Sequence, residues 1–130
     1  MQLLFFALCV VAQISAIAAV YCHPLTMGQE LRDKITSRHE KSYGDSEHPK
    51  YNCELEQMAR AMMKIASYDL PKRFGWIMVE GTGTNTDEKL DDAFGQLMEK
   101  LKKAKNPPKR YGCFFDDNWP VLNCVYDTKI

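Results

Sequence analysis

The residues in this sequence best able to do chemistry are its five cysteines. One of them, Cys9, lies in an apolar N-terminal segment, and the four that follow are Cys22, Cys53, Cys113 and Cys124. An even number of cysteines in a small exported domain predicts two disulfides, and four cysteines allow three pairings. In the chain-entropy model a short Cys113–Cys124 loop would contribute roughly 3 kcal/mol and a long Cys53–Cys113 loop roughly 4 kcal/mol. Spacing does not choose between them, and the lack of a C-x-x-C pair argues against a metal site.

Other catalytic groups are sparse. The chain has three histidines, all before residue 51: His23, His39 and His48. It contains neither a G-x-S-x-G nucleophile motif nor an H-E-x-x-H metal motif. The adjacent acids Asp91–Asp92 and Asp116–Asp117 point apart, whereas paired-carboxylate hydrolysis needs two acids facing one cleft. His39 falls on the apolar face of a predicted helix, where we expect a structural histidine. The sequence therefore predicts no enzyme, no catalytic residue, no cofactor and no metal.

An apolar segment opens the chain. Residues 3–20 carry no charge and only two polar side chains, and Ala16, Ala18 and Ala19 suit a signal-peptidase site. We therefore predict a signal peptide over residues 1–19, with cleavage between positions 18 and 22, followed by one small secreted domain over residues 20–130. An uncleaved membrane anchor is the alternative, although the segment is at the short end of the roughly 20 residues that span a bilayer.

Charge is balanced, with 17 Lys and Arg against 17 Asp and Glu. That balance argues against nucleic acid, which is bound by clustered cations, and against stable membrane association of the secreted domain. One local excess of basic residues lies near the end of the third predicted helix: Lys100, Lys103, Lys109 and Arg110. These cations could bind a glycosaminoglycan or an anionic lipid. The alternative is that the lysines only complement the helix dipole.

The elements that must position these residues follow from hydrophobic periodicity, which predicts three helices and three strands. The expected helix limits are Thr26 (N-cap) to about Lys41, Asn52 (N-cap) to Ala66, and Thr86 (N-cap) to Lys105. Strands are expected over residues 74–80, 111–115 and 121–126, the last two forming a hairpin around a turn at 116–120. The predicted fold class is α+β, with about three helices packed on a small antiparallel sheet that ends in the hairpin and is stabilised by disulfides.

Three pieces of the chain occur in an order that matches a known family. They are the charged helix with a histidine at residues 30–41, the run YNCELEQMA from Tyr51 to Ala59, and the ending, YGC at 111–113 followed by LNCVY at 122–126. Together they resemble the secreted CAP-superfamily proteins of parasitic nematodes, the activation-associated secreted proteins. Those proteins carry a Y-(D/N)-C-x-L-E-x-x-A helix and a G-C…C-x-Y terminal hairpin.

The sequence departs from that family pattern at the CAP cleft. CAP domains bring two His and two Glu together in a central cleft that can bind a divalent metal. This chain has no histidine after His48 and lacks the G-E-N and H-x-x-G-C segments. It is therefore most similar to a reduced offshoot, the activation-associated secreted protein-related family of hookworm-type nematodes. The resemblance implies release at the parasite–host interface and no inherited active site.

The predicted function is therefore that of a secreted, non-catalytic effector that binds a host protein or other macromolecule. The expected contact surfaces are the loops at residues 42–50 and 81–86 and the hairpin tip at residues 116–119, where the candidate contacts are Trp119, Asp117 and Asn118. An aromatic side chain at a turn makes a good interface anchor, and packing back onto the domain is the alternative for it. A small hydrophobic-ligand carrier is a second hypothesis, with a pocket lined by Met58, Met62, Met63, Phe74, Trp76 and Phe94. A secreted protease inhibitor is a third.

Overall fold

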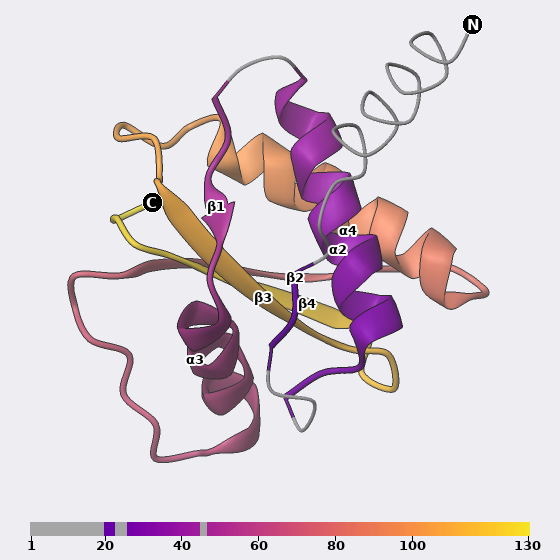
Figure 1. Cartoon of the computed structure of the whole chain (residues 1–130). Coiled ribbons are helices and arrows are strands. Elements are labelled where there is room, and N and C mark those ends of the chain that lie inside the picture. Colours follow the sequence, from indigo (N-terminus) through magenta and orange to yellow (C-terminus); the bar gives the residue numbers. More distant parts are fainter. Residues whose placement is uncertain (1–19, 23–25, 45–46) are drawn as a thin grey trace, which may run out of the picture.

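The computed structural model describes residues 20–22, 26–44 and 47–130 (Figure 1). The predicted signal peptide, residues 1–19, lies outside the described residues, as do Cys9 and His23. No helix within the described ranges is long and apolar enough to cross a membrane.

Three helices and four strands make up the described part of the chain. In order they are α2 (Gln29–Tyr43), β1 (Lys50–Tyr51), α3 (Cys53–Lys64), β2 (Gly75–Glu80), α4 (Thr86–Leu101), β3 (Arg110–Asp116) and β4 (Val121–Tyr126). The strands form one sheet in the order β1-β3-β4-β2. Helix α3 packs on one face of the sheet, and α2 and α4 pack together on the other (Figure 1).

The predicted disulfide-stabilised α+β fold is confirmed, with one difference in the sheet. Strands β2, β3 and β4 are antiparallel as predicted, whereas β1 runs parallel to β3. Lys50 pairs with Arg110, and Tyr51 pairs with Tyr111. The sheet is therefore mixed. A two-residue strand carries no alternation of apolar and polar residues, so no sequence pattern could reveal it.

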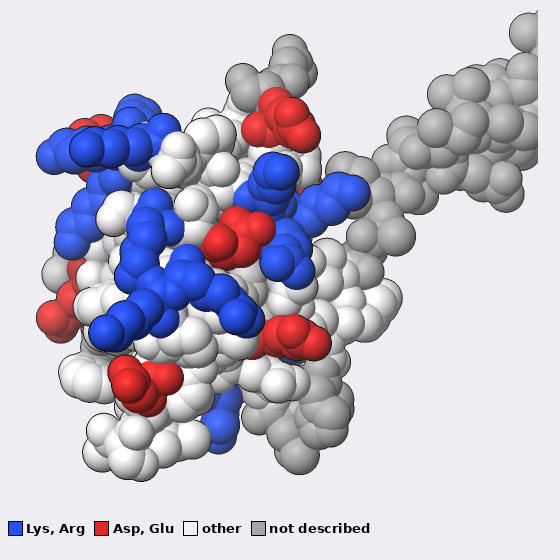
Figure 2. All heavy atoms as spheres, turned by 90° about the vertical axis from the view of Figure 1, so that its left-hand side faces the viewer, with Lys and Arg blue, Asp and Glu red and all other residues white. Residues whose placement is uncertain are grey.

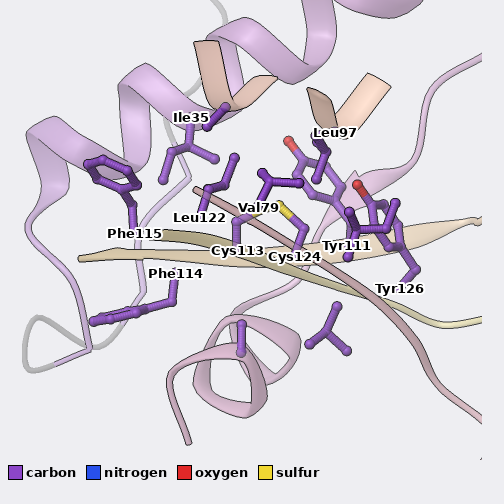
Figure 3. Packing of buried hydrophobic residues seen from close by; sticks show 14 of the residues in the cluster. Ile35, Val79, Leu97, Tyr111, Cys113, Phe114, Phe115, Leu122, Cys124 and Tyr126 are labelled. Carbon is purple, nitrogen blue, oxygen red and sulfur yellow. A yellow bond between two sulfur atoms is a disulfide. The ribbon is translucent and has the colours of Figure 1, made fainter. Parts of the chain in front are cut away.

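Alternation along the hairpin strands sends side chains into two separate cores. Figure 3 shows Tyr111 and Phe115 on the side of α2 and α4, and Phe114 on the opposite side, toward α3. Gly112 also faces α3, and a side chain there would collide with the backbone of Asn52 and Glu56. The backbone of α3 therefore lies directly on β3, which only glycine permits at this position.

Helix α2 begins later than predicted, because its N-cap is Gly28 and not Thr26. Thr26 is buried in a turn before the helix. The first helical side chain, Gln29, donates a hydrogen bond of 2.7 Å to the carbonyl of Val20. The start of the helix is thus set by a contact with the N-terminal segment, which a local capping pattern does not contain.

Helix α4 also differs from its predicted limits. Its N-cap is Asn85, whose side chain accepts the Glu88 N–H at 2.9 Å, whereas the predicted cap Thr86 is the first helical residue. The helix ends at Leu101, not Lys105. Beyond it the Ala104 N–H reaches back three residues to the Leu101 carbonyl at 3.0 Å, a tight turn of the kind that often closes α-helices.

Helix α3 starts at the predicted cap but is shorter than expected. The side chain of Asn52 accepts the Leu55 N–H at 3.0 Å, so this predicted N-cap is confirmed. The helix ends at Lys64. Ile65 and Ala66 were predicted to be buried, but Ile65 is 48% exposed and Ala66 is exposed as well. The prediction was wrong there because the backbone turns extended at Ile65, and periodicity has no meaning beyond the end of a helix.

Candidate functional site

Two disulfides join the four cysteines that follow the apolar segment. Cys22–Cys53 ties residues 20–22 to the first residue of α3, with the Cα atoms 5.4 Å apart. Cys113–Cys124 joins directly paired residues of β3 and β4, with the Cα atoms 4.0 Å apart. The long Cys53–Cys113 loop considered from the sequence is therefore not formed. No thiol in the described part of the chain is left to act as a nucleophile or a metal ligand.

The segment Tyr51–Ala59, which carries the most specific resemblance, contains half of a buried ion pair. Glu56 accepts two hydrogen bonds from Arg32 of α2, at 2.7 Å from Nε and 2.9 Å from Nη2. Both side chains are at most 1% exposed. The Tyr51 hydroxyl also donates to Glu56. Hydrogen bonding to Glu56 raises the pKa of Arg32, and burial raises the pKa of Tyr51 well above its usual value.

Four other residues of this segment are structural as well: Asn52, Cys53, Leu55 and Ala59. Asn52 caps α3, Cys53 forms a disulfide and Leu55 is buried in the core. The Ala59 carbonyl accepts a hydrogen bond of 3.1 Å from the side-chain amide of Asn123. The segment therefore builds the junction between α2, α3, β1 and β3, and each of these side chains is occupied within the fold.

Sequence analysis missed the Arg32–Glu56 pair, although a signal for it exists. Glu56 follows Leu55 and precedes Ala59 by three positions, so helical periodicity places a carboxylate on the buried face. A buried charge requires a partner, because leaving water without one is very costly. The identity of the partner, 24 residues earlier in the chain, is a fact of the tertiary fold.

His39 lies fully buried in a cluster of tyrosines. Its ring stacks on Tyr111, with ring centroids 3.7 Å apart, and its Nε2 lies 3.2 Å from the Tyr126 hydroxyl. Burial, with a smaller contribution from the charge of His48, lowers the pKa of His39 to about 3. The imidazole is therefore neutral near pH 7. Its environment is that of the expected structural histidine, and no carboxylate among the described residues hydrogen-bonds to it.

The two adjacent acid pairs diverge, as predicted. Asp91 pairs with Arg38 of α2 at 2.8 Å, whereas Asp92 accepts the Thr82 N–H at 2.8 Å on another side of α4. Within the described ranges no group of three or more His, Cys, Asp or Glu side chains could hold a metal ion.

The hairpin turn, residues 116–120, is held from both helix layers. Lys64 of α3 pairs with Asp116. On the other side, Asp117 accepts hydrogen bonds from the Thr86 hydroxyl at 2.8 Å and from Lys89 at 3.3 Å, both on α4. Between these attachments Trp119 remains 56% exposed. The three residues expected at the contact surface thus lie on one turn, where Asp117 is partly occupied by α4 and Trp119 projects to solvent.

Asn118 contributes to the shape of this turn. Its N–H donates to the Asp116 side chain at 3.1 Å, which closes a local turn of the Asx type. The Gly81 N–H donates to the Pro120 carbonyl at 2.8 Å, so the end of β2 supports the turn as well. The backbone of the turn is therefore fixed by contacts within the domain.

The lysines predicted as an anion-binding group all lie on exposed surface at the C-terminal end of α4, in the loop after it and at the start of β3. Two further exposed lysines, Lys102 and Lys105, lie in the same stretch, and Lys50 lies on the adjacent strand β1. We call these seven cations the basic surface: Lys50, Lys100, Lys102, Lys103, Lys105, Lys109 and Arg110. Lys50 was not predicted to belong here, and it joins through the β1–β3 pairing. Figure 2 shows a gathering of Lys and Arg on the side of the molecule that bears the loop between α4 and β3.

The residues proposed to line a ligand pocket do not come together. Phe94 belongs to α4, and Met58 and Met62 belong to α3 on the opposite face of the sheet. Trp76 is 50% exposed. The sheet therefore divides the apolar side chains between two cores, and the six residues do not line one cavity.

These features define a small α+β protein with two disulfides, whose most recognisable segment is structural. A family model described as Ancylostoma-associated secreted protein related matches residues 22–126, and the chain belongs to this family, as the resemblance predicted. The match begins at the first disulfide cysteine and ends at the last residue of β4, so it spans the folded unit. No curated protein and no solved structure matches the chain.

Proposed function

We propose that this protein is released from the cell after loss of its N-terminal apolar segment and acts outside as a non-catalytic binding protein on a host macromolecule. The observation that carries the proposal is Trp119, a large aromatic side chain 56% exposed on a turn that is fixed from both sides of the sheet. Its family of secreted-protein relatives and its two disulfides support the extracellular location.

The turn suits a recognition anchor for an energetic reason. Hot-spot residues at interfaces are enriched in tryptophan, because one such side chain buries a large apolar area in a pocket of the partner. Binding normally costs conformational entropy when a loop becomes ordered. Here the ion pairs at Asp116 and Asp117 already fix the backbone that carries Trp119, so little ordering remains to oppose association.

The test compares two exposed tryptophans. Purified protein and its Trp119→Ala and Trp76→Ala variants are applied to arrays of host extracellular proteins, with excess soluble heparin present to suppress purely ionic capture. Trp76 is the matched control, since it is 50% exposed but lies on β2. We expect Trp119→Ala to abolish a reproducible interaction that Trp76→Ala retains. Equal binding by the wild type and Trp119→Ala would contradict the proposal.

Release itself has a direct test. When the full chain is expressed in a eukaryotic secretory cell, the medium should contain protein whose first residue lies at or before Cys22, because Cys22 must survive to pair with Cys53. Cell-bound protein that still begins at Met1 would contradict release. If the bound host protein were an extracellular protease whose activity the protein inhibits, the inhibitor hypothesis would replace the more general effector role.

A further inference from the structure

The basic surface is more than the end of a helix. Six cations and no acid occur between residues 100 and 110. Those on the last turn of α4 stabilise that helix, because cations complement its negative C-terminal end. Lys50 and Lys109 have no such role, since Lys50 lies on β1 and Lys109 immediately precedes β3. The helix dipole therefore does not account for Lys50 and Lys109.

A groove brings these two lysines together. It has a volume of about 650 Å³. One wall is formed by residues 47–50, which lead into β1, and the other by the two prolines that precede β3. Its basic lining residues are His48, Lys50, Lys109 and Arg110. The prolines Pro107 and Pro108 stiffen one wall, because a proline ring fixes its own backbone φ angle.

Two acids border the groove, and one of them is already engaged. Asp127 pairs with Arg110 at 3.3 Å and accepts the Lys109 N–H at 3.0 Å, and its side chain is only 13% exposed. Glu47 is the other acid. Within the described ranges, Lys50 and Lys109 take part in no ion pair, and both residues are exposed.

The overall neutrality of the chain hides this arrangement. At the opposite end of α4, Asp87 and Asp91 are paired with Lys34 and Arg38 of α2. Asp117 is paired there with Lys89. The ion pairs at the N-terminal end of α4 cancel local charge there. Cations remain in excess at residues 100–110, and Figure 2 shows Lys and Arg gathered on the side of the molecule that bears this loop.

We propose that the basic surface binds a sulfated polysaccharide, with sulfate groups along one chain contacting the groove and the lysines of the loop after α4. Stable attachment to a membrane needs an apolar or lipid anchor besides basic residues. None of the large exposed apolar side chains of the described residues lines the groove: Tyr21, Ile65, Trp76, Trp119 and Ile130. Single-stranded nucleic acid is normally held by stacking on exposed aromatics, which the basic surface also lacks. A flexible polyanion needs only a row of cations.

The experiment measures binding of a size-defined heparin decasaccharide to the full secreted protein by surface plasmon resonance over a series of NaCl concentrations. The variant is Lys50→Gln/Lys109→Gln, which leaves the lysines of α4 in place. The matched control is Arg60→Gln/Lys72→Gln, which removes the same charge from α3 and from the segment that follows it. Thermal unfolding checks that both variants are folded.

We expect heparin to bind and the affinity to fall with rising salt, because binding releases counterions. Each cation near an anionic surface contributes about 1 kcal/mol, so the Lys50→Gln/Lys109→Gln variant should bind about 30-fold more weakly, while the control changes little. The proposal would be overturned if fully desulfated heparin bound as well as heparin, or if variant and control lost affinity equally. Binding to phosphatidylserine vesicles or to an oligonucleotide, but not to heparin, would also overturn it.

Discussion

The segment Tyr51–Ala59 and the turn at residues 116–120 use their side chains in opposite ways. The first can be recognised from its sequence, and its tyrosine, asparagine, cysteine and second glutamate, Glu56, are all engaged within the fold. The second carries no recognised motif, yet it holds Trp119 exposed on a fixed backbone. A recognisable motif in this protein therefore marks a junction of the fold, and the candidate contact surface has to be sought where no motif exists.

The largest expected effect comes from the interior segment. Glu56→Ala should lower the free energy of unfolding by about 3–5 kcal/mol, because it leaves the Arg32 guanidinium buried without its partner. Urea unfolding followed by circular dichroism measures this. The double variant Arg32→Met/Glu56→Met should regain much of the loss, since it removes both charges. A loss below about 1 kcal/mol in Glu56→Ala would mean that the ion pair contributes little.

The two disulfides sharpen the comparison, because one starts in the segment Tyr51–Ala59 and the other joins the two strands that carry the turn. Removing Cys22–Cys53, with a sequence separation of 31, should cost about 4 kcal/mol, and removing Cys113–Cys124, with a separation of 11, about 3 kcal/mol. The difference reflects the longer loop that the first bridge closes in the unfolded chain. Paired Cys→Ser variants compared by thermal unfolding provide the measurement. The reverse order would show that loop entropy does not govern these bridges.

Acid should destabilise the interior cluster around His39. Its pKa is about 3 in the folded protein against 6.5 in the unfolded chain, so below pH 6.5 the unfolded state binds a proton that the folded state excludes. The contribution of neutral His39 to the free energy of unfolding is complete above pH 6.5. Below pH 6.5 it declines by about 1.4 kcal/mol per pH unit, which amounts to about 2–3 kcal/mol between pH 7 and pH 4.5.

Chemical unfolding at several pH values tests this dependence. His39→Phe should flatten the slope between pH 6.5 and 4.5, whereas His48→Gln, at an exposed position, should leave most of it in place. An unchanged slope in His39→Phe would assign the acid sensitivity to other groups.

The smallest expected effect on stability belongs to the turn. Trp119→Ala should change the free energy of unfolding by no more than about 0.5 kcal/mol, because substitutions at exposed positions that support no structural feature are nearly neutral. Calorimetry on the variant measures this. A loss of 2 kcal/mol or more would mean that Trp119 packs onto the domain in solution, the alternative considered from the sequence, and would remove the basis of the proposed contact surface.

Much of the fold follows from interactions between residues close in sequence. Asn52 and Leu55 are three positions apart, and the hairpin strands flank a connection of four residues, 117–120, so the cap of α3 and the β3–β4 pairing could be predicted. Helical periodicity likewise found the buried face of α4, including Leu90 and Leu97. The even number of cysteines after Cys9 indicated two bridges but not which residues they join.

The contacts that give the molecule its particular character join distant residues. Arg32 meets Glu56, Lys50 lies beside Arg110, and Cys22 pairs with Cys53. Local pattern therefore determined the class of fold and most of the elements. The tertiary structure alone decided which charges are buried in pairs and which gather on a surface. Both outcomes depend on three-dimensional distance and on desolvation, and neither of these follows from local sequence pattern.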